Sequence, residues 1–177
     1  PTEVVYPPMP VTIKTPACPV VVAPPAAGAA GEWQIEAEGS SVRAEFRNSA
    51  GELLGFALTG DATRAKIELQ KARAERQLLA WLESCVVGLN LCPFARPVVE
   101  GSGLRIAVCE ADDSEEGLLR MQEHLLRELD LMQGSSAEEV ATTLLAFTGG
   151  LVHFDDYLDF LDQANALLAA AGLEGVI

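Results

Sequence analysis

The first third of the chain alternates between apolar and polar residues. Alternation with a period of two is typical of half-buried β-strands. Five short segments show it or form a short apolar run: residues 11–15, 20–22, 32–38, 42–47 and 53–59. The prolines beside the first two segments place them at a sheet edge or a bulge. Residues 48–51 have the composition of a hairpin turn that ends in glycine. The pattern therefore predicts a small antiparallel β unit, with Trp33, Ile35 and Ala37 on one face of a strand.

Beyond residue 60 the apolar positions recur every three or four residues, which is the period of an α-helix. Asp61 is a suitable N-cap, and no glycine or proline interrupts residues 62–87, so one helix or two abutting helices are expected there. Residues 88–97 are expected to form a loop. Ser114 starts a second predicted helix, which ends at Gly134.

The remaining elements alternate in type along the chain. A third helix is predicted at residues 155–171, and strands are predicted at residues 105–109, at residues 142–147 and from residue 173 onward. The order α-β-α-β-α-β is typical of layered α/β structures. We therefore expect a mixed α+β or α/β fold, in which a small antiparallel β unit with one helix precedes an incomplete layered domain.

Charge changes at the same place as the pattern. Residues 1–73 hold seven basic and eight acidic residues, a net charge of −1, whereas residues 74–177 hold five basic and eighteen acidic residues, a net charge of −13. We therefore predict two domains, 1–73 and 74–177. The chain starts without methionine and ends on a strand-like segment, so we expect both ends to continue in a longer protein.

Composition also restricts the class of function. An acidic half argues against nucleic acid and against an anionic membrane surface, because both require clustered Lys and Arg. No apolar run approaches the roughly 18 residues that span a membrane. The cysteines form no CxxC pair, which argues against a zinc site and favours reduced thiols in the cytoplasm: Cys18, Cys85, Cys92 and Cys109.

The most distinctive motif of the first domain is Lys14-Thr15-Pro16-Ala17-Cys18-Pro19. A lysine on an edge strand can simply block aggregation, and this is one interpretation of Lys14. Together with residues 6–13 and the run at 55–60, however, the motif resembles the C-terminal domain of bacterial rubredoxin reductases, which use FAD and NAD(P)H. The resemblance covers about residues 6–72.

That resemblance implies a function in electron transfer with rubredoxin as the partner. In the family this domain packs against the FAD domain and helps to dock rubredoxin. The resemblance implies that Lys14 lies close to the flavin ring, where an ammonium stabilises the reduced anion, and that Thr15 and Pro16 hold its backbone. The chain has no GxGxxG fingerprint, so FAD and NAD(P)H are expected to bind to other domains of the full-length protein.

The second domain carries the run Gly88-Leu89-Asn90-Leu91-Cys92-Pro93-Phe94-Ala95. With residues 142–145, 154–162 and 172–176, this run resembles an uncharacterised bacterial family, a domain of unknown function. Cys92 is either a small core residue or a reactive thiol. A nucleophilic thiol needs a base, and the chain offers His153 and His124. The resemblance implies a further base, because that family continues into a segment with a His-Pro motif.

Acidic residues at the start of the third helix raise the question of a metal. Asp155, Asp159 and Asp162 share one helix face, but a solvated acidic face is the preferred interpretation, and no metal is predicted. The favoured function is electron transfer, as the rubredoxin-docking domain of an FAD-dependent NAD(P)H:rubredoxin reductase. The alternatives are a thiol or hydrolytic enzyme centred on Cys92, and a module that only docks.

Overall fold

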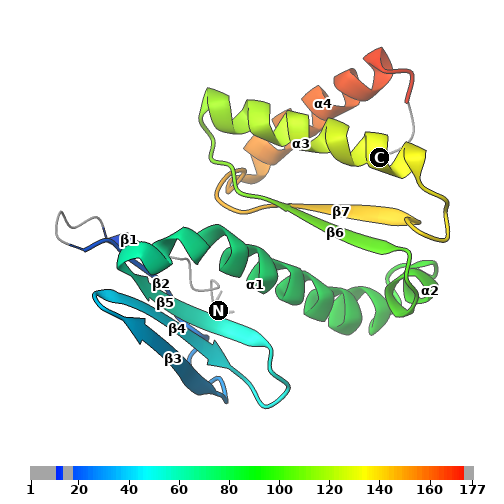
Figure 1. The fold of residues 1–177 in the computed structure, drawn as a ribbon. Helices are drawn as coiled ribbons and strands as arrows, with labels where there is room; N and C mark the ends of the chain where they lie inside the picture. The colour runs from blue at the N-terminus through cyan, green and yellow to red at the C-terminus, as the bar shows by residue number, and fades with distance from the viewer. Residues whose placement is uncertain (1–10, 14–17, 174–177) are drawn as a thin grey trace, which may run out of the picture. The chain divides into compact units, whose positions relative to one another are not determined.

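The computed structural model describes residues 11–13 and 18–173. The chain divides into two compact units, Pro1–Gln77 and Leu78–Ile177. Each contains both helices and strands, which confirms the predicted fold class (Figure 1). The predicted boundary between residues 73 and 74 lies inside helix α1 (Lys66–Trp81), shortly before this division.

The first unit is built on a five-stranded antiparallel sheet. Its strand order is β1-β2-β5-β4-β3, so the first and third strands of the chain form its edges. The bounds are β1 Val11–Ile13, β2 Val20–Ala23, β3 Glu32–Glu38, β4 Ser41–Arg47 and β5 Leu53–Thr59. The bounds of each strand agree with the predicted ones to within two residues. Residues 14 and 15, which were expected to end the first strand, lie outside the described residues.

The register gives the sheet two faces of different composition. Residues directly opposite each other in antiparallel strands point to the same side. On the side that packs against α1, which we call the helix face, Val21, Leu58 and Phe56 form a core with Leu69 of the helix. The other side, which we call the far face, carries two rows of residues that cross all five strands: Val11, Val22, Ala57, Ala44 and Ile35, and Ile13, Val20, Thr59, Val42 and Ala37.

Residues 60–87 are helical without a break, in line with the one helix or two abutting helices expected over residues 62–87, but the type of helix changes along them. The segment starts with a 3-10 helix, η1 (Gly60–Ala65), continues as α1, and ends as a π-helix, η2 (Leu82–Val87). Asp61 is not the N-cap, because it lies inside the first turn of η1 and Thr59 precedes that turn. The π-helix is marked by a hydrogen bond from the amide of Gly88 to the carbonyl of Glu83, five residues earlier.

The second unit has a pair of parallel strands with helices α3 and α4 on the same side (Figure 1). Its further elements are α2 Ala95–Glu100, β6 Leu104–Cys109, α3 Glu115–Gly134, β7 Thr142–Phe147 and α4 Phe154–Ala170. The predicted loop at residues 88–97 is too long, because α2 begins at Ala95. Pro97 is tolerated there because the first turn of a helix needs no amide donor.

The predicted start of α3 at Ser114 and the predicted extent of α4 agree with the structure to within one residue. Ser114 caps α3 by accepting a hydrogen bond from the amide of Gly117. Gly172, with φ +71°, ends α4, and the following amide of Leu173 returns to the carbonyl of Leu168. The core consists of apolar residues of α3 and α4 with one loop residue: Ala111, Met121, Leu125, Leu129, Phe160, Ala164 and Leu168. The strand predicted beyond residue 173 lies outside the described residues.

None of the helices in the described part of the chain combines the length and the apolarity needed to cross a bilayer.

Candidate functional site

Three chain connections meet at one end of the five-stranded sheet. The last cross-strand row contains Ile13, Val20, Thr59, Val42 and Ala37. The chain therefore enters β2, turns between β3 and β4, and leaves β5 at the same end. We call this the loop end, and it comprises residues 18–19, 38–41 and 59–62.

Hydrogen bonds tie these connections together. The Thr59 hydroxyl donates to the carbonyl of Ser40 (3.1 Å) and accepts from the amide of Val42 (2.9 Å). The Ser41 hydroxyl accepts from the amide of Asp61 (3.0 Å), so the hairpin also holds the first turn of η1. The amide of Gly60 donates to the carbonyl of Pro19 (3.0 Å), which fixes the entry to β2. The loop end is thus one bonded structure.

Gly60 makes this close approach possible. Its φ of +58° lies in the left-handed region, which favours glycine. A Cβ on Gly60 would lie 2.8 Å from the Ser41 hydroxyl and 3.2 Å from the carbonyl of Ser40. Any larger residue would therefore strain the backbone and separate β5 from the hairpin.

A shallow hollow of about 820 Å³ lies beside the loop end, and three of the four charged residues that line it are acidic. Glu36, Glu38 and Asp61 face it, together with Arg43, which is engaged by Glu45 and more weakly by Glu68. Such a lining favours cationic groups and repels phosphates. The pyrophosphate of FAD or NAD(P)H does not fit here. The described residues of the first unit also contain no parallel βαβ unit that could hold a dinucleotide.

The predicted flavin-contacting residues Lys14, Thr15 and Pro16 lie outside the described residues. The neighbouring described residues, Ile13 and Cys18, are both at the loop end. The Cys18 thiol contacts the carbonyl of Ser40 at 4.0 Å, which places it against the hairpin. The roles of the three residues stay predictions.

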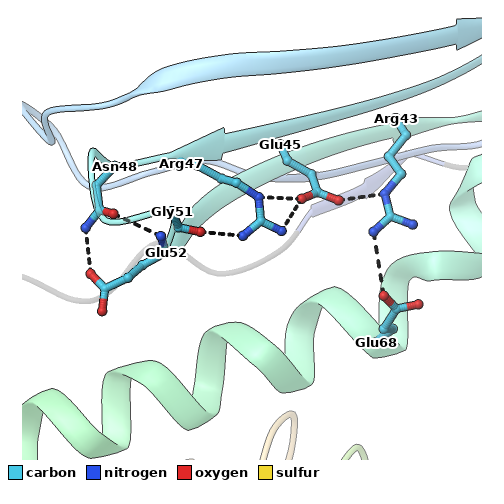
Figure 2. A network of polar contacts seen from close by, with 7 residues as sticks. All are labelled: Arg43, Glu45, Arg47, Asn48, Gly51, Glu52 and Glu68. Carbon is cyan, nitrogen blue, oxygen red and sulfur yellow. Dashed lines mark hydrogen bonds and ion pairs between the residues drawn. The ribbon is translucent and has the colours of Figure 1, made fainter.

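The helix face carries a charged network that the sequence analysis did not identify (Figure 2). Glu45 of β4 is 8% exposed and sits between two arginines of the same strand. Its carboxylate accepts from Arg43 Nε (2.6 Å), from Arg47 Nε (2.9 Å) and from an Arg47 terminal nitrogen (2.5 Å). The sequence pattern assigned these alternate residues to the polar side of the strand, but α1 covers that side.

The network connects three elements of the first unit. Arg47 also donates to the carbonyl of Gly51 in the β4–β5 turn (2.6 Å), and Arg43 reaches Glu68 of α1 at 3.6 Å (Figure 2). Burial raises the pKa of Glu45, but the hydrogen bonds and charges of the two arginines outweigh it, so the pKa stays below its ordinary value. The spacing Arg-x-Glu-x-Arg could have revealed this network in the sequence, because it places three charges of alternating sign on one face of a strand.

In the second unit no hydrogen bond joins Cys92 and His153. Cys92 is half-buried and precedes α2, which is drawn at the starting end of β6, whereas His153 precedes α4 at the finishing end of β7 (Figure 1). His124 is half-buried on α3, in contact with Arg127. A catalytic role of Cys92 or His153 stays a prediction.

Two other features of the second unit bear on its chemistry. Arg105 of β6 forms a forked ion pair with Glu128 of α3 at 2.5 and 3.0 Å, and Glu128 is 3% exposed. This pair joins a strand to its covering helix. The acidic residues at the start of α4 are exposed, and no group of three or more His, Cys, Asp or Glu within the described ranges could hold a metal ion.

Comparison with known proteins gives each part of the chain a separate relationship. Residues 3–73 match the family described as rubredoxin binding C-terminal domain, and residues 73–177 match the family described as protein of unknown function (DUF1415). A rubredoxin-NAD(+) reductase of Alcanivorax borkumensis is 61% identical over 70 residues. These residues are 40% of this chain but only 18% of that reductase. Both resemblances expected from the sequence motifs are confirmed.

Proposed function

We propose that residues 3–73 are an electron-transfer docking domain, because they match the family described as rubredoxin binding C-terminal domain. Through residues 73–177 the chain belongs to the family described as protein of unknown function (DUF1415). In this proposal they hold rubredoxin against the flavin of an NAD(P)H:rubredoxin reductase. The carrying observation is the 61% identity over 70 residues to a rubredoxin-NAD(+) reductase. The proposed activity takes place in the cytoplasm.

FAD and NAD(P)H are assigned to other domains of a full-length protein. The described residues supply no cradle for either cofactor, and the hollow at the loop end is acidic. The contribution of this chain is therefore positioning. Bonds among Pro19, Ser40, Thr59 and Gly60 give the loop end a fixed geometry, and such rigidity keeps donor and acceptor at one distance.

A fusion protein tests this proposal. The other 82% of the Alcanivorax borkumensis reductase is joined to residues 3–177 of this chain, in place of its own matching segment. We expect the fusion to reduce rubredoxin with NADH within about tenfold of the intact reductase. Ferricyanide is the control acceptor, because a small ion needs no docking surface. A fusion that reduces ferricyanide normally, but rubredoxin no faster than a reductase lacking the segment, would refute the proposal.

Lys14 is tested in the same fusion. The proposal places its ammonium near the flavin, so Lys14→Met lowers the reduction potential of the flavin while Lys14→Arg, which keeps the charge, changes it much less. If Lys14 only blocks aggregation at a strand edge, both variants leave the potential unchanged. The potential is read by spectroelectrochemical titration.

A further inference from the structure

The first turns of α4 in the second unit present apolar side chains to solvent. Phe154 is 70% exposed, Tyr157 43% and Leu158 41%. Positions three and four residues apart are neighbours on a helix surface, so the three side chains adjoin one another, and we call them the aromatic strip. The rings of Phe154 and Tyr157 stack, with their centroids 6.1 Å apart. The strip therefore offers a flat aromatic surface to a neighbouring molecule.

The loop before α4 fixes where the strip lies. The amide of Thr148 donates to the carbonyl of Cys109 (2.9 Å), and the amide of Leu151 donates to the carboxylate of Asp113 (2.5 Å). The Leu151 side chain packs against the core of α3 and α4, as does Phe160 one turn after the strip. Because both ends of the strip are held, its exposed side chains belong to a fixed surface.

Negative charge borders the aromatic strip along one side. Asp155 and Asp162 lie three residues before and four residues after Leu158, so both flank it on the helix surface, and both are exposed. No lysine or arginine follows Arg127 in the sequence, and within the described ranges neither aspartate takes part in an ion pair. The strip therefore lies beside carboxylates whose charge the chain does not balance locally.

Aromatic rings beside carboxylates favour a cationic neighbour, and among cationic side chains they favour arginine. A guanidinium group stacks on an aromatic face and at the same time pairs with a carboxylate, whereas an ammonium is compact and strongly hydrated. A second copy of the chain fits poorly, because residues 74–177 carry a net charge of −13 and two such surfaces repel each other. The same repulsion argues against an anionic lipid surface.

We propose that the aromatic strip is the docking site for an arginine-rich segment of a partner protein. Guanidinium groups of the segment lie over the rings of Phe154 and Tyr157 and pair with Asp155 and Asp162. Apolar side chains of the segment cover Leu158. This site is separate from the docking of rubredoxin, which is assigned to residues 3–73, and its test does not require the reductase.

The test titrates the complete chain with a short peptide of alternating arginine and leucine, followed by calorimetry. We expect saturable binding that weakens as the salt concentration rises, because part of the attraction is between exposed charges. The same peptide with lysine in place of arginine is expected to bind more weakly, because an ammonium lacks the flat face that stacks on the rings. A peptide with glutamate in place of arginine is expected not to bind.

Paired variants locate the site, because a basic peptide is attracted to any acidic protein. Phe154→Ser is expected to weaken binding by about fivefold, whereas Phe94→Ser, at a phenylalanine that is 79% exposed and close to Arg96, changes it by less than about twofold. Asp162→Lys is expected to weaken binding by about three- to fivefold, and Asp130→Lys, at an exposed aspartate of α3, by less than about twofold. All four side chains are exposed, so the far-ultraviolet circular dichroism is expected to stay unchanged.

A photo-crosslinking group in the arginine–leucine peptide gives a measurement on the unsubstituted protein. Its adducts are expected on residues 152–162. The proposal is overturned if the peptide does not bind, if the two members of each variant pair weaken binding equally, or if the adducts lie elsewhere. It is also overturned if the chain alone sediments as a dimer that Phe154→Ser dissociates, since the strip would then be an interface between two copies.

Discussion

The substitution Glu45→Gln removes one charge from the network on the helix face while keeping the size of the side chain. Glu45 accepts three hydrogen bonds, one from Arg43 and two from Arg47. A glutamine has one acceptor oxygen, so it can serve only one of the arginines and turns an amide donor toward the other. At least one charge-assisted bond is lost, and the remaining ones lose the carboxylate charge.

The structure sets the size of the effect. Losing a hydrogen bond to a charged group costs about 1.5–3 kcal/mol, and breaking a fully buried ion pair costs about 3–5 kcal/mol. The Glu45 side chain is 11% exposed, but the side chains of Arg43 and Arg47 are 33% and 30% exposed, so water can hydrate the released guanidinium groups. We therefore expect Glu45→Gln to destabilise the first unit by about 2 kcal/mol at pH 7.

The effect depends on pH with a definite sign. The pKa of Glu45 is lower in the folded protein than in the unfolded chain, so the unfolded state binds the proton more readily. The stabilisation is complete above the unfolded pKa, near 4.3–4.5, and is lost as the pH falls through the lower, folded pKa. The difference in stability between wild type and Glu45→Gln is thus expected to shrink below about pH 4.5.

The assay is urea denaturation followed by the fluorescence of Trp33. The chain has two tryptophans, and Trp81→Phe removes the second, so the signal reports on β3 and its neighbour Phe46. Glu68→Gln is the matched control, because Glu68 is 73% exposed and meets Arg43 at 3.6 Å. It is expected to change the free energy of unfolding by less than about 0.5 kcal/mol. A Glu45→Gln effect no larger than this control, or one that is the same at pH 3 and pH 7, would refute the reasoning.

Three further predictions concern other parts of the chain. Glu128→Gln breaks the forked ion pair with Arg105 and is expected to lower the free energy of unfolding of the second unit by about 2–4 kcal/mol, measured by urea denaturation. A loss below about 0.5 kcal/mol, which is the size expected for a surface ion pair, would contradict this prediction. Gly60→Ala, at φ +58°, is expected to cost the first unit about 1–2 kcal/mol in the same assay, and an unchanged midpoint contradicts the contact with the hairpin. Burial raises the pKa of the Cys109 thiol, so its alkylation rate is expected to rise at higher pH in the folded protein than in the urea-unfolded chain. The rate is measured in a variant in which the other three cysteines are changed to serine, and coincident pH profiles of the folded and unfolded protein would contradict the prediction.

The elements that the sequence predicted well are those that local patterns determine. β3 and β5 have the predicted bounds because alternation and turn residues fix both ends. β7 agrees as well, since a β-branched and apolar run follows a turn. The cap of α3 at Ser114 depends only on residues within one turn, and the sequence shows all of them.

The elements that the sequence missed depend on contacts distant in the chain. The segment from Gly60 to Val87 has no Gly or Pro after its first residue, yet it changes helix type twice. The 3-10 turn η1 is held by Ser41, from a hairpin about twenty residues earlier. In η2 the Ser84 hydroxyl donates to the carbonyl of Ala80, a competitor for the regular ladder that no apolar period reveals.

The burial of Glu45 was missed for a related reason, and it explains how the two faces of the sheet differ. Alternation separates polar from apolar residues, but it does not say which set lies under a helix. In β4 the polar set is covered. Helix α1 overlies β2 and β5, and the same side continues into Arg43, Glu45 and Arg47. Their net charge of +1 is balanced by Glu68 of α1, which pairs with Arg43. The apolar set of β3, with Trp33 and Ile35, faces outward. A charged side costs more under a helix than in water, and in β4 the ion pairs of Glu45 with Arg43 and Arg47 offset that cost.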